Sequence, residues 1–201
     1  MKISRNWFNK NRIIHGLLGL NLGEVLEWST SFVADYKVAC AIENYTHQQS
    51  QGVVISWQRP IQNYYKINTD AAFDSARKAV GIEIVIRDSM GKVMVYGAHR
   101  IYATYTPQVA KVVAIYWGLL LAHLTGLTNV MPESDAAVVD WINAGKVFYS
   151  EVGVVVDDIR RLLQCFSSSP VSYVSRKANS VAHHLATLAL FSDDDHVWLE
   201  D

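Results

Sequence analysis

Hydrophobic and polar residues alternate along residues 80–87, which is typical of a β-strand with two different faces. One face carries Ile82, Ile84 and Ile86, and the other carries Glu83 and Val85. Residues 64–73 before this stretch and residues 92–98 after it also have the composition of strands. Short polar turns separate the three stretches, so we predict an antiparallel meander.

After the meander, helices are predicted to alternate with short strands. Pro107 opens a long helix that is apolar nearly all round, as expected for a helix buried between a sheet and another layer. Two further strands are predicted at 128–133 and 171–175. Three further helices are predicted at 135–143, 151–166 and 179–190. The order predicts an α/β fold with a five-stranded mixed sheet, in which two parallel strands extend the meander and helices flank it.

The chain divides into four parts by composition. Residues 1–43 form an N-terminal segment, in which 24–39 predict an amphipathic helix that packs against the main domain. Residues 44–56 are rich in Asn, Gln and Ser and are interpreted as a polar linker. The main domain covers 57–191, and an acidic C-terminal tail covers 192–201.

Charge and cysteine content exclude several classes of protein. The 201 residues carry 18 Lys and Arg against 19 Asp and Glu. Residues 57–191 hold a net charge of +3 and residues 192–201 a net charge of −5, so no strongly basic nucleic-acid-binding face is evident. Two cysteines exclude a disulfide scaffold. No uncharged apolar run reaches membrane-spanning length, so no membrane partner is expected.

Five short motifs in the main domain follow the order of the predicted elements. They are Asn-Thr-Asp-Ala-Ala at 68–72, Val-Ile-Arg-Asp with Gly-Lys-Val at 85–93, the helix start at 110–118, Glu-Ser-Asp at 133–135, and Ser-Arg-Lys-Ala-Asn-Ser-Val-Ala-His at 175–183. Together they resemble the plant ribonuclease H-like domain family, which is related to the reverse transcriptases of plant non-LTR retroelements. The resemblance implies a ribonuclease H-like fold. It also implies a hydrolase activity, that of an endonuclease that cleaves the RNA of RNA–DNA hybrids. Carboxylates would hold two divalent cations, Mg²⁺ or Mn²⁺, for this reaction.

The resemblance implies that Asp70 and Asp135 are catalytic metal ligands, with Glu133 as a candidate further ligand. The alternative for Asp135 is an ordinary helix cap. His183 falls where active bacterial-type enzymes have another Asp. It is interpreted as a helix histidine near Asp70, with a role as proton carrier as the alternative.

Lys111 departs from the family pattern, which has Glu at this position. Two unit charges about 4 Å apart interact by ~4 kcal/mol at an effective dielectric near 20. An ammonium group here would therefore repel Mg²⁺ and pair with Asp70 or Asp135. We accordingly predict impaired catalysis, with Mg²⁺ or Mn²⁺ required only if the protein is active.

The turn before the last helix supplies candidate phosphate contacts, Arg176, Lys177 and Asn179, with a solvated loop as the alternative. The expected partner is an RNA–DNA hybrid or RNA, bound weakly, and no protein partner is identified. A second hypothesis is a catalytically inactive module of retroelement origin that binds nucleic acid or a protein. An intracellular location, nuclear or cytoplasmic, is expected, with organelle targeting by the acid-poor N-terminus as the alternative.

Overall fold

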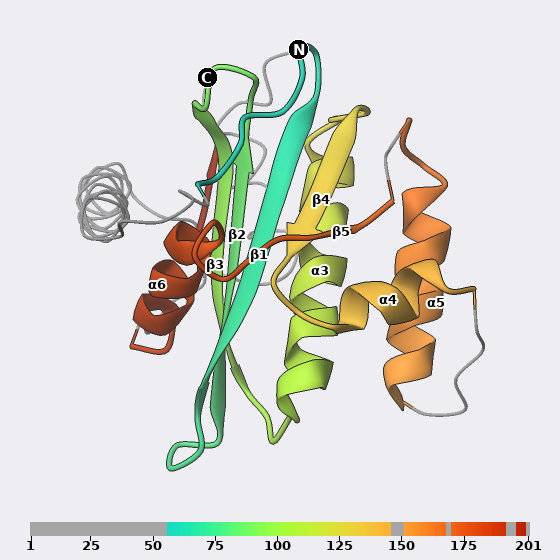
Figure 1. Cartoon of the computed structure of the whole chain (residues 1–201). Coiled ribbons are helices and arrows are strands. Elements are labelled where there is room, and N and C mark those ends of the chain that lie inside the picture. Colours follow the sequence, from blue (N-terminus) through green and yellow to red (C-terminus); the bar gives the residue numbers. More distant parts are fainter. Residues whose placement is uncertain (1–55, 146–150, 168–169, 192–195, 200–201) are drawn as a thin grey trace.

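The computed structural model describes residues 56–145, 151–167, 170–191 and 196–199 (Figure 1). The predicted N-terminal segment at 1–43, with its amphipathic helix, lies outside the described residues, as does the predicted linker except for Ser56. The described residues include the whole predicted meander and all the predicted elements that follow it.

The strands and helices predicted for the main domain are present, although several of their ends differ. The strands are β1 (Tyr65–Asp74), β2 (Ala79–Arg87), β3 (Val93–Tyr102), β4 (Val130–Ser134), β5 (Ser172–Tyr173) and β6 (His196–Leu199). The helices are α3 (Pro107–Leu124), α4 (Val138–Asn143), α5 (Glu151–Leu163) and α6 (Ser180–Ala189). β6 lies within the predicted acidic tail and adds a sixth strand to the five that were expected.

The strands form one mixed sheet in the order β5-β4-β1-β2-β3-β6. The meander β1–β2–β3 is antiparallel, and β4 and β5 run parallel to β1 on its other side, as predicted. β4 ends where Ser134 pairs with Thr69, but β1 continues to Asp74. Asp70 is therefore the first residue of β1 without a neighbouring strand on that side.

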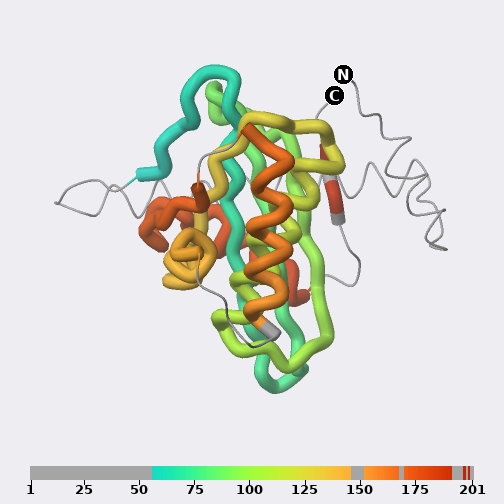
Figure 2. The backbone as a smooth tube through the Cα atoms, turned by 90° about the vertical axis from the view of Figure 1, so that its right-hand side faces the viewer, coloured from blue at the N-terminus to red at the C-terminus, as the bar shows by residue number. Residues whose placement is uncertain are grey.

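The two faces of the sheet are covered by different helices. Figure 1 shows α6 on one side and α3 on the other, with α4 and α5 beyond α3. Figure 2 looks onto α5, which lies across the outer side of α3. Ile82, Ile84 and Ile86 face α3, and Val85 packs with Val181 and Leu185 of α6. The alternation predicted for this strand is therefore confirmed.

The apolar surface of α3 is explained by the layers on both of its sides. Its buried residues pack against β1 and β2 in one direction and against α5 in the other. By length and composition, α3 is the one helix among the described residues that could cross a membrane. Packing within the domain accounts for that composition, as the sequence predicts.

Two glycines allow the helices on both faces to approach the centre of the sheet closely. A Cβ atom at Gly118 of α3 would lie 2.7 Å from Cγ2 of Thr69. A Cβ atom at Gly81 of β2 would collide with the backbone oxygen of Ala186 in α6. The second half of α3 is thereby held close to β1, and the C-terminal half of α6 is held close to β2.

Candidate functional site

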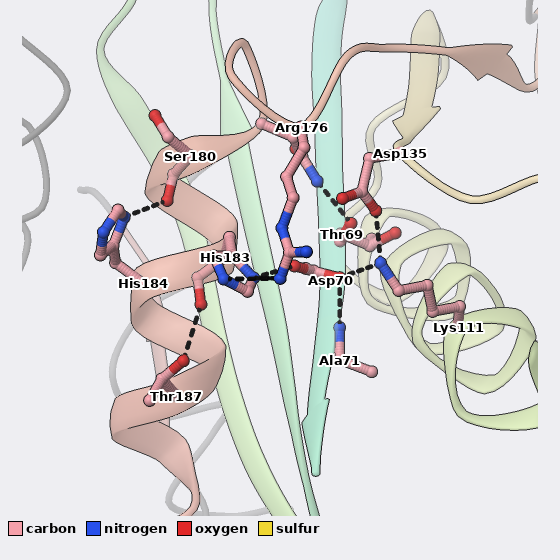
Figure 3. A network of polar contacts seen from close by, with 11 residues as sticks. Thr69, Asp70, Ala71, Lys111, Asp135, Arg176, Ser180, His183, His184 and Thr187 are labelled. Carbon is pink, nitrogen blue, oxygen red and sulfur yellow. Dashed lines mark hydrogen bonds and ion pairs between the residues drawn. The ribbon is translucent and has the colours of Figure 1, made fainter. Parts of the chain in front are cut away.

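Asp70 is the centre of a network of charged side chains at the end of β4 (Figure 3). Its side chain points to the α6 side of the sheet and is almost fully buried. Oδ1 accepts a hydrogen bond from the backbone N–H of Ala71 at 2.8 Å. Strand β1 continues past the end of β4, and this opening lets a side chain from α3, on the other face of the sheet, also reach Asp70.

Lys111 reaches Asp70 from the start of α3. The helix begins after Thr106, whose side chain accepts a hydrogen bond from the N–H of Val109, and Pro107 occupies its first turn. The Nζ atom of Lys111 lies 2.7 Å from Oδ1 of Asp70 and 2.5 Å from Oδ1 of Asp135. The ion pair predicted for Lys111 is therefore present, and it involves both carboxylates.

The charges of this cluster stabilise one another. Burial would raise the pKa of Asp70, but hydrogen bonds from His183 and Lys111 and the charge of Lys111 outweigh it, so that this pKa is lowered. Burial would lower the pKa of Lys111, but the charge of Asp70 and the hydrogen bonds to both carboxylates outweigh it, so that this pKa is raised. The ammonium group and the Asp70 carboxylate therefore both stay charged at neutral pH.

His183 of α6 approaches Asp70 from the opposite side of the sheet. Its Nδ1 lies 2.8 Å from Oδ2 of Asp70, and its Nε2 lies 2.9 Å from Nη2 of Arg176. A guanidinium group can only donate, so the two contacts assign the proton of a neutral imidazole to Nδ1 and the accepting lone pair to Nε2. His183 thus lies near Asp70 as predicted, and Arg176 covers its outer edge.

Glu133 belongs to a second network, beside Asn68 rather than Asp70. Its Oε1 lies 2.7 Å from Nζ of Lys66, and its Oε2 accepts a hydrogen bond from Nδ2 of Asn68 at 3.1 Å. Oδ1 of Asn68 accepts hydrogen bonds from Trp57 and Arg87, both at 2.8 Å. The candidate extra metal ligand is therefore bound by a lysine and an amide.

These residues do not fit a divalent cation. Mg²⁺ and Mn²⁺ need several oxygen ligands, and within the described part of the chain no three His, Cys, Asp or Glu side chains group closely enough to hold a metal ion. The one positive group between Asp70 and Asp135 is the ammonium of Lys111. Lys111 therefore balances, within the described residues, the charge that a metal ion would have to balance.

The three predicted phosphate contacts differ in exposure. Arg176 and Lys177 are exposed on the turn that precedes α6. Asn179 is 1% exposed, and its Nδ2 donates to the backbone oxygen of Thr69 at 3.0 Å. Burial contradicts the phosphate contact predicted for Asn179, because its amide group instead fixes the start of α6 beside Asp70.

Glu83 is a residue of this region that the sequence motifs did not single out. It pairs with Asp70 across β1 and β2 and is completely buried. Burial raises the pKa of Glu83 well above its usual value, a hydrogen bond with Tyr96 opposes this, and the charge of Asp70 adds to it. The alternation of residues along β2 could have identified Glu83, because it placed this acidic residue on the face opposite Ile82, Ile84 and Ile86.

The strand order and the flanking helices are those of a ribonuclease H-like fold. A model of the reverse transcriptase-like family matches residues 68–189. The chain therefore belongs to this reverse transcriptase-like family, whose domain is RNase H-like. A comparison with curated proteins finds no match. The plant and retroelement origins implied by the motifs remain predictions.

Solved ribonucleases H share the fold. RNase H1 from the archaeon Halobacterium salinarum superposes with a TM-score of 0.58 at 20% identity, covering 64% of this chain and 98% of its own. The N-terminal RNase H domain of a Mycobacterium tuberculosis protein superposes with a TM-score of 0.57 at 20% identity, covering 64% of this chain and 94% of its own. LC11-RNase H1, solved in complex with an RNA/DNA hybrid, superposes with a TM-score of 0.56 at 19% identity, covering 63% of this chain and 96% of its own. Identities this low establish the fold alone.

Proposed function

We propose that this chain is an RNase H-like domain that binds RNA–DNA hybrids and whose metal-dependent cleavage of RNA is impaired by Lys111. The observation that carries the proposal is the position of the Lys111 ammonium group between Asp70 and Asp135. Those are the two carboxylates to which the family resemblance assigns the metal ions.

A divalent cation would have to compete with a cation that is already part of the chain. At ~4 Å and an effective dielectric near 20, each unit of positive charge on the metal is repelled by Lys111 by ~4 kcal/mol. Displacing Lys111 would leave its charged group, now 19% exposed, without its two partners. Both effects weaken the binding of Mg²⁺ or Mn²⁺.

Binding of the hybrid does not require the metal. The exposed guanidinium of Arg176 contacts the outer edge of His183, and Lys177 is exposed beside it, so phosphate oxygens can contact both. The solved complex of LC11-RNase H1 with a hybrid supports the same class of ligand for this fold. With a net charge of +3 over residues 57–191, the affinity is expected to be low and dependent on salt.

The first test measures binding of a labelled RNA–DNA hybrid by fluorescence anisotropy without divalent cations. The double variant Arg176→Gln, Lys177→Gln should bind more weakly, and the slope of log K against log salt should become shallower by about two. Arg161→Gln is the matched control, because Arg161 is exposed on α5 on the other side of the sheet. Equal affinity of the double variant and the control would contradict a hybrid site here.

The second test measures cleavage of the same hybrid with Mg²⁺ or Mn²⁺. The wild type should cleave poorly or not at all, whereas Lys111→Glu should gain activity that Asp70→Asn then abolishes. Robust cleavage by the wild type, lost on Asp70→Asn alone, would refute the role given to Lys111. The thermal stability of each variant is measured alongside, so that unfolding is not mistaken for inactivity.

A further inference from the structure

Two aromatic side chains are exposed at the end of α6 that is remote from Asp70. Tyr102 is 69% exposed and Phe191 is 63% exposed, and each faces an arginine. The guanidinium carbon of Arg77 lies 5.5 Å from the centre of the Phe191 ring, and that of Arg100 lies 5.0 Å from the centre of the Tyr102 ring. We call these four residues the arginine–aromatic patch.

Both arginines of the patch are held in place by the fold. Asp74 forms a 2.9 Å ion pair with Arg77 and accepts its backbone N–H at 3.0 Å, which fixes the β1–β2 turn. Arg100 donates to the backbone oxygen of Leu190 at 3.3 Å. Leu190 is itself buried and leads directly into Phe191. The patch is therefore pre-organised around one end of α6.

The patch lies on the same face of the sheet as the Asp70 cluster. Arg100 pairs with Gly81, which contacts α6 directly, and Tyr102 follows on the same face two residues later. Figure 1 shows α6 running from the region of β5 down toward the β1–β2 hairpin. The 10 residues of α6 span about 15 Å, or roughly four to five nucleotides at about 3.4 Å each.

We propose that the arginine–aromatic patch binds single-stranded nucleic acid that extends from a hybrid seated at the Asp70 cluster. The location of the hybrid rests on the proposed function above, whereas the patch itself is argued from its own side chains. Exposed aromatic rings stack on bases of any sequence, and arginines contribute phosphate contacts and cation–π interactions. Lys78 is exposed next to Arg77 and adds a positive charge.

Charge alone gives only modest attraction at this end of the domain. Three aspartates follow Phe191 in the sequence at 193–195, outside the described residues, and their charge opposes a polyanion. Stacking on Tyr102 and Phe191 is therefore expected to provide most of the gain. A gain of about tenfold in affinity is the expected scale, since stacking on an aromatic side chain contributes roughly five-fold to a hundredfold per base.

The test uses the full chain and three labelled probes: a blunt RNA–DNA hybrid, the same hybrid with a single-stranded extension, and the extension as a free oligonucleotide. The extended hybrid should bind about tenfold more tightly than the blunt one. The double variant Tyr102→Ala, Phe191→Ala should lose this gain but bind the blunt hybrid as before. Phe191→Tyr, which keeps the ring, and Arg161→Gln, on the remote α5, should retain it.

The three probes separate the two proposals. If the double variant no longer binds the free oligonucleotide, and neither the wild type nor any variant binds the blunt hybrid, the patch is supported and the hybrid site is contradicted. An extension that adds nothing to the affinity of the wild type would overturn the patch proposal, as would an equal loss of the blunt and extended hybrids in the double variant. The exposed aromatics would then belong to a surface for a different partner, such as a protein.

Discussion

The ammonium group of Lys111 holds together two carboxylates that would otherwise repel one another at the end of β4. Asp70 is fully shielded from solvent and Asp135 nearly so, and each has an oxygen within 2.7 Å of Nζ of Lys111. The hydrogen bond from His183 and the charge of Lys111 lower the pKa of Asp70, and the two carboxylates raise the pKa of Lys111. At the residue scale, this pairing is the main departure from a metal-binding site.

Lys111→Met should destabilise the domain, because two buried carboxylates lose their counter-charge. We expect the free energy of unfolding at pH 7 to fall by about 2 kcal/mol or more, measured by urea denaturation. The pKa of Asp70 is lowered in the folded state, so its stabilising contribution is present above the usual aspartate pKa and is lost as the pH falls through the lowered value. The difference between variant and wild type should therefore shrink in acid.

Lys177→Met is the control for this variant, because Lys177 is exposed on the turn before α6. Its free energy of unfolding should lie within about 0.5 kcal/mol of the wild type. If Lys111→Met were as stable as this control, the ion pairs would contribute nothing measurable, and the account of the cluster would be wrong.

Glu83→Gln should stabilise the domain at neutral pH. The raised pKa of Glu83 means that the folded state binds its proton more tightly than the unfolded state does. The cost of this burial is absent below the usual glutamate pKa and grows as the pH rises toward the raised value. The gain in unfolding free energy should be near zero in acid and on the order of 1 kcal/mol or more at pH 7. A gain that does not depend on pH would contradict this assignment.

At the scale of elements, two helices pack closely on opposite faces of the sheet, each at a glycine, and both contribute side chains to the cluster. Gly118 lets α3 lie against Thr69 and Ile67, and Gly81 lets α6 lie against β2. Thr69 also anchors the start of α6, through the hydrogen bond that its backbone oxygen accepts from Asn179. Lys111 and His183 can therefore reach one carboxylate from opposite sides of the sheet.

Gly81→Ala should displace α6, because the added methyl group would collide with the backbone of Ala186 and Leu190. The free energy of unfolding should fall by about 1–3 kcal/mol. Gly97→Ala in β3 is the matched control, since its methyl group would meet only side chains, the nearest being Leu121 at 3.2 Å. Equal stability of the two variants would show that α6 can move without cost.

The sequence predicts the elements well because their periods differ clearly, and it predicts their ends less well. β5 was expected over five residues but contains two, since its neighbour β4 ends at Ser134. β3 was expected to end at Ala98 but continues to Tyr102, because β2 pairs with it along its whole length. These ends depend on the length of the partner strand, which local composition does not encode.

The candidate site was predicted unevenly for a related reason. The places of these residues in the motifs and their opposite charges predicted that Lys111 pairs with Asp70 or Asp135, and the structure contains both ion pairs. Asn179 points inward because it binds Thr69, and Glu133 forms an ion pair with Lys66. Both partners are remote in sequence. Motif positions indicate which residues converge, but not which way a side chain turns at the end of an element.

At the scale of the whole molecule, the two sides of the sheet differ in composition, since one holds most of the core and the other holds the charged cluster and the patch. The side with α3, α4 and α5 holds most of the large buried side chains, including Ile82, Ile115 and Ile159. The α6 side carries the Asp70 cluster and the arginine–aromatic patch at its two ends. We therefore expect nucleic acid to approach from the α6 side, and substitutions on the exposed surface of α5 to leave its binding unchanged.

The most direct test of the central claim is a titration of Mn²⁺ followed by isothermal calorimetry and thermal unfolding. The wild type should show neither heat of binding nor a rise in Tm, because Lys111 already balances Asp70 and Asp135. Lys111→Glu should bind Mn²⁺ and gain stability with its concentration. A Tm of the wild type that rises with Mn²⁺, and no longer rises in Asp70→Asn, would contradict the account.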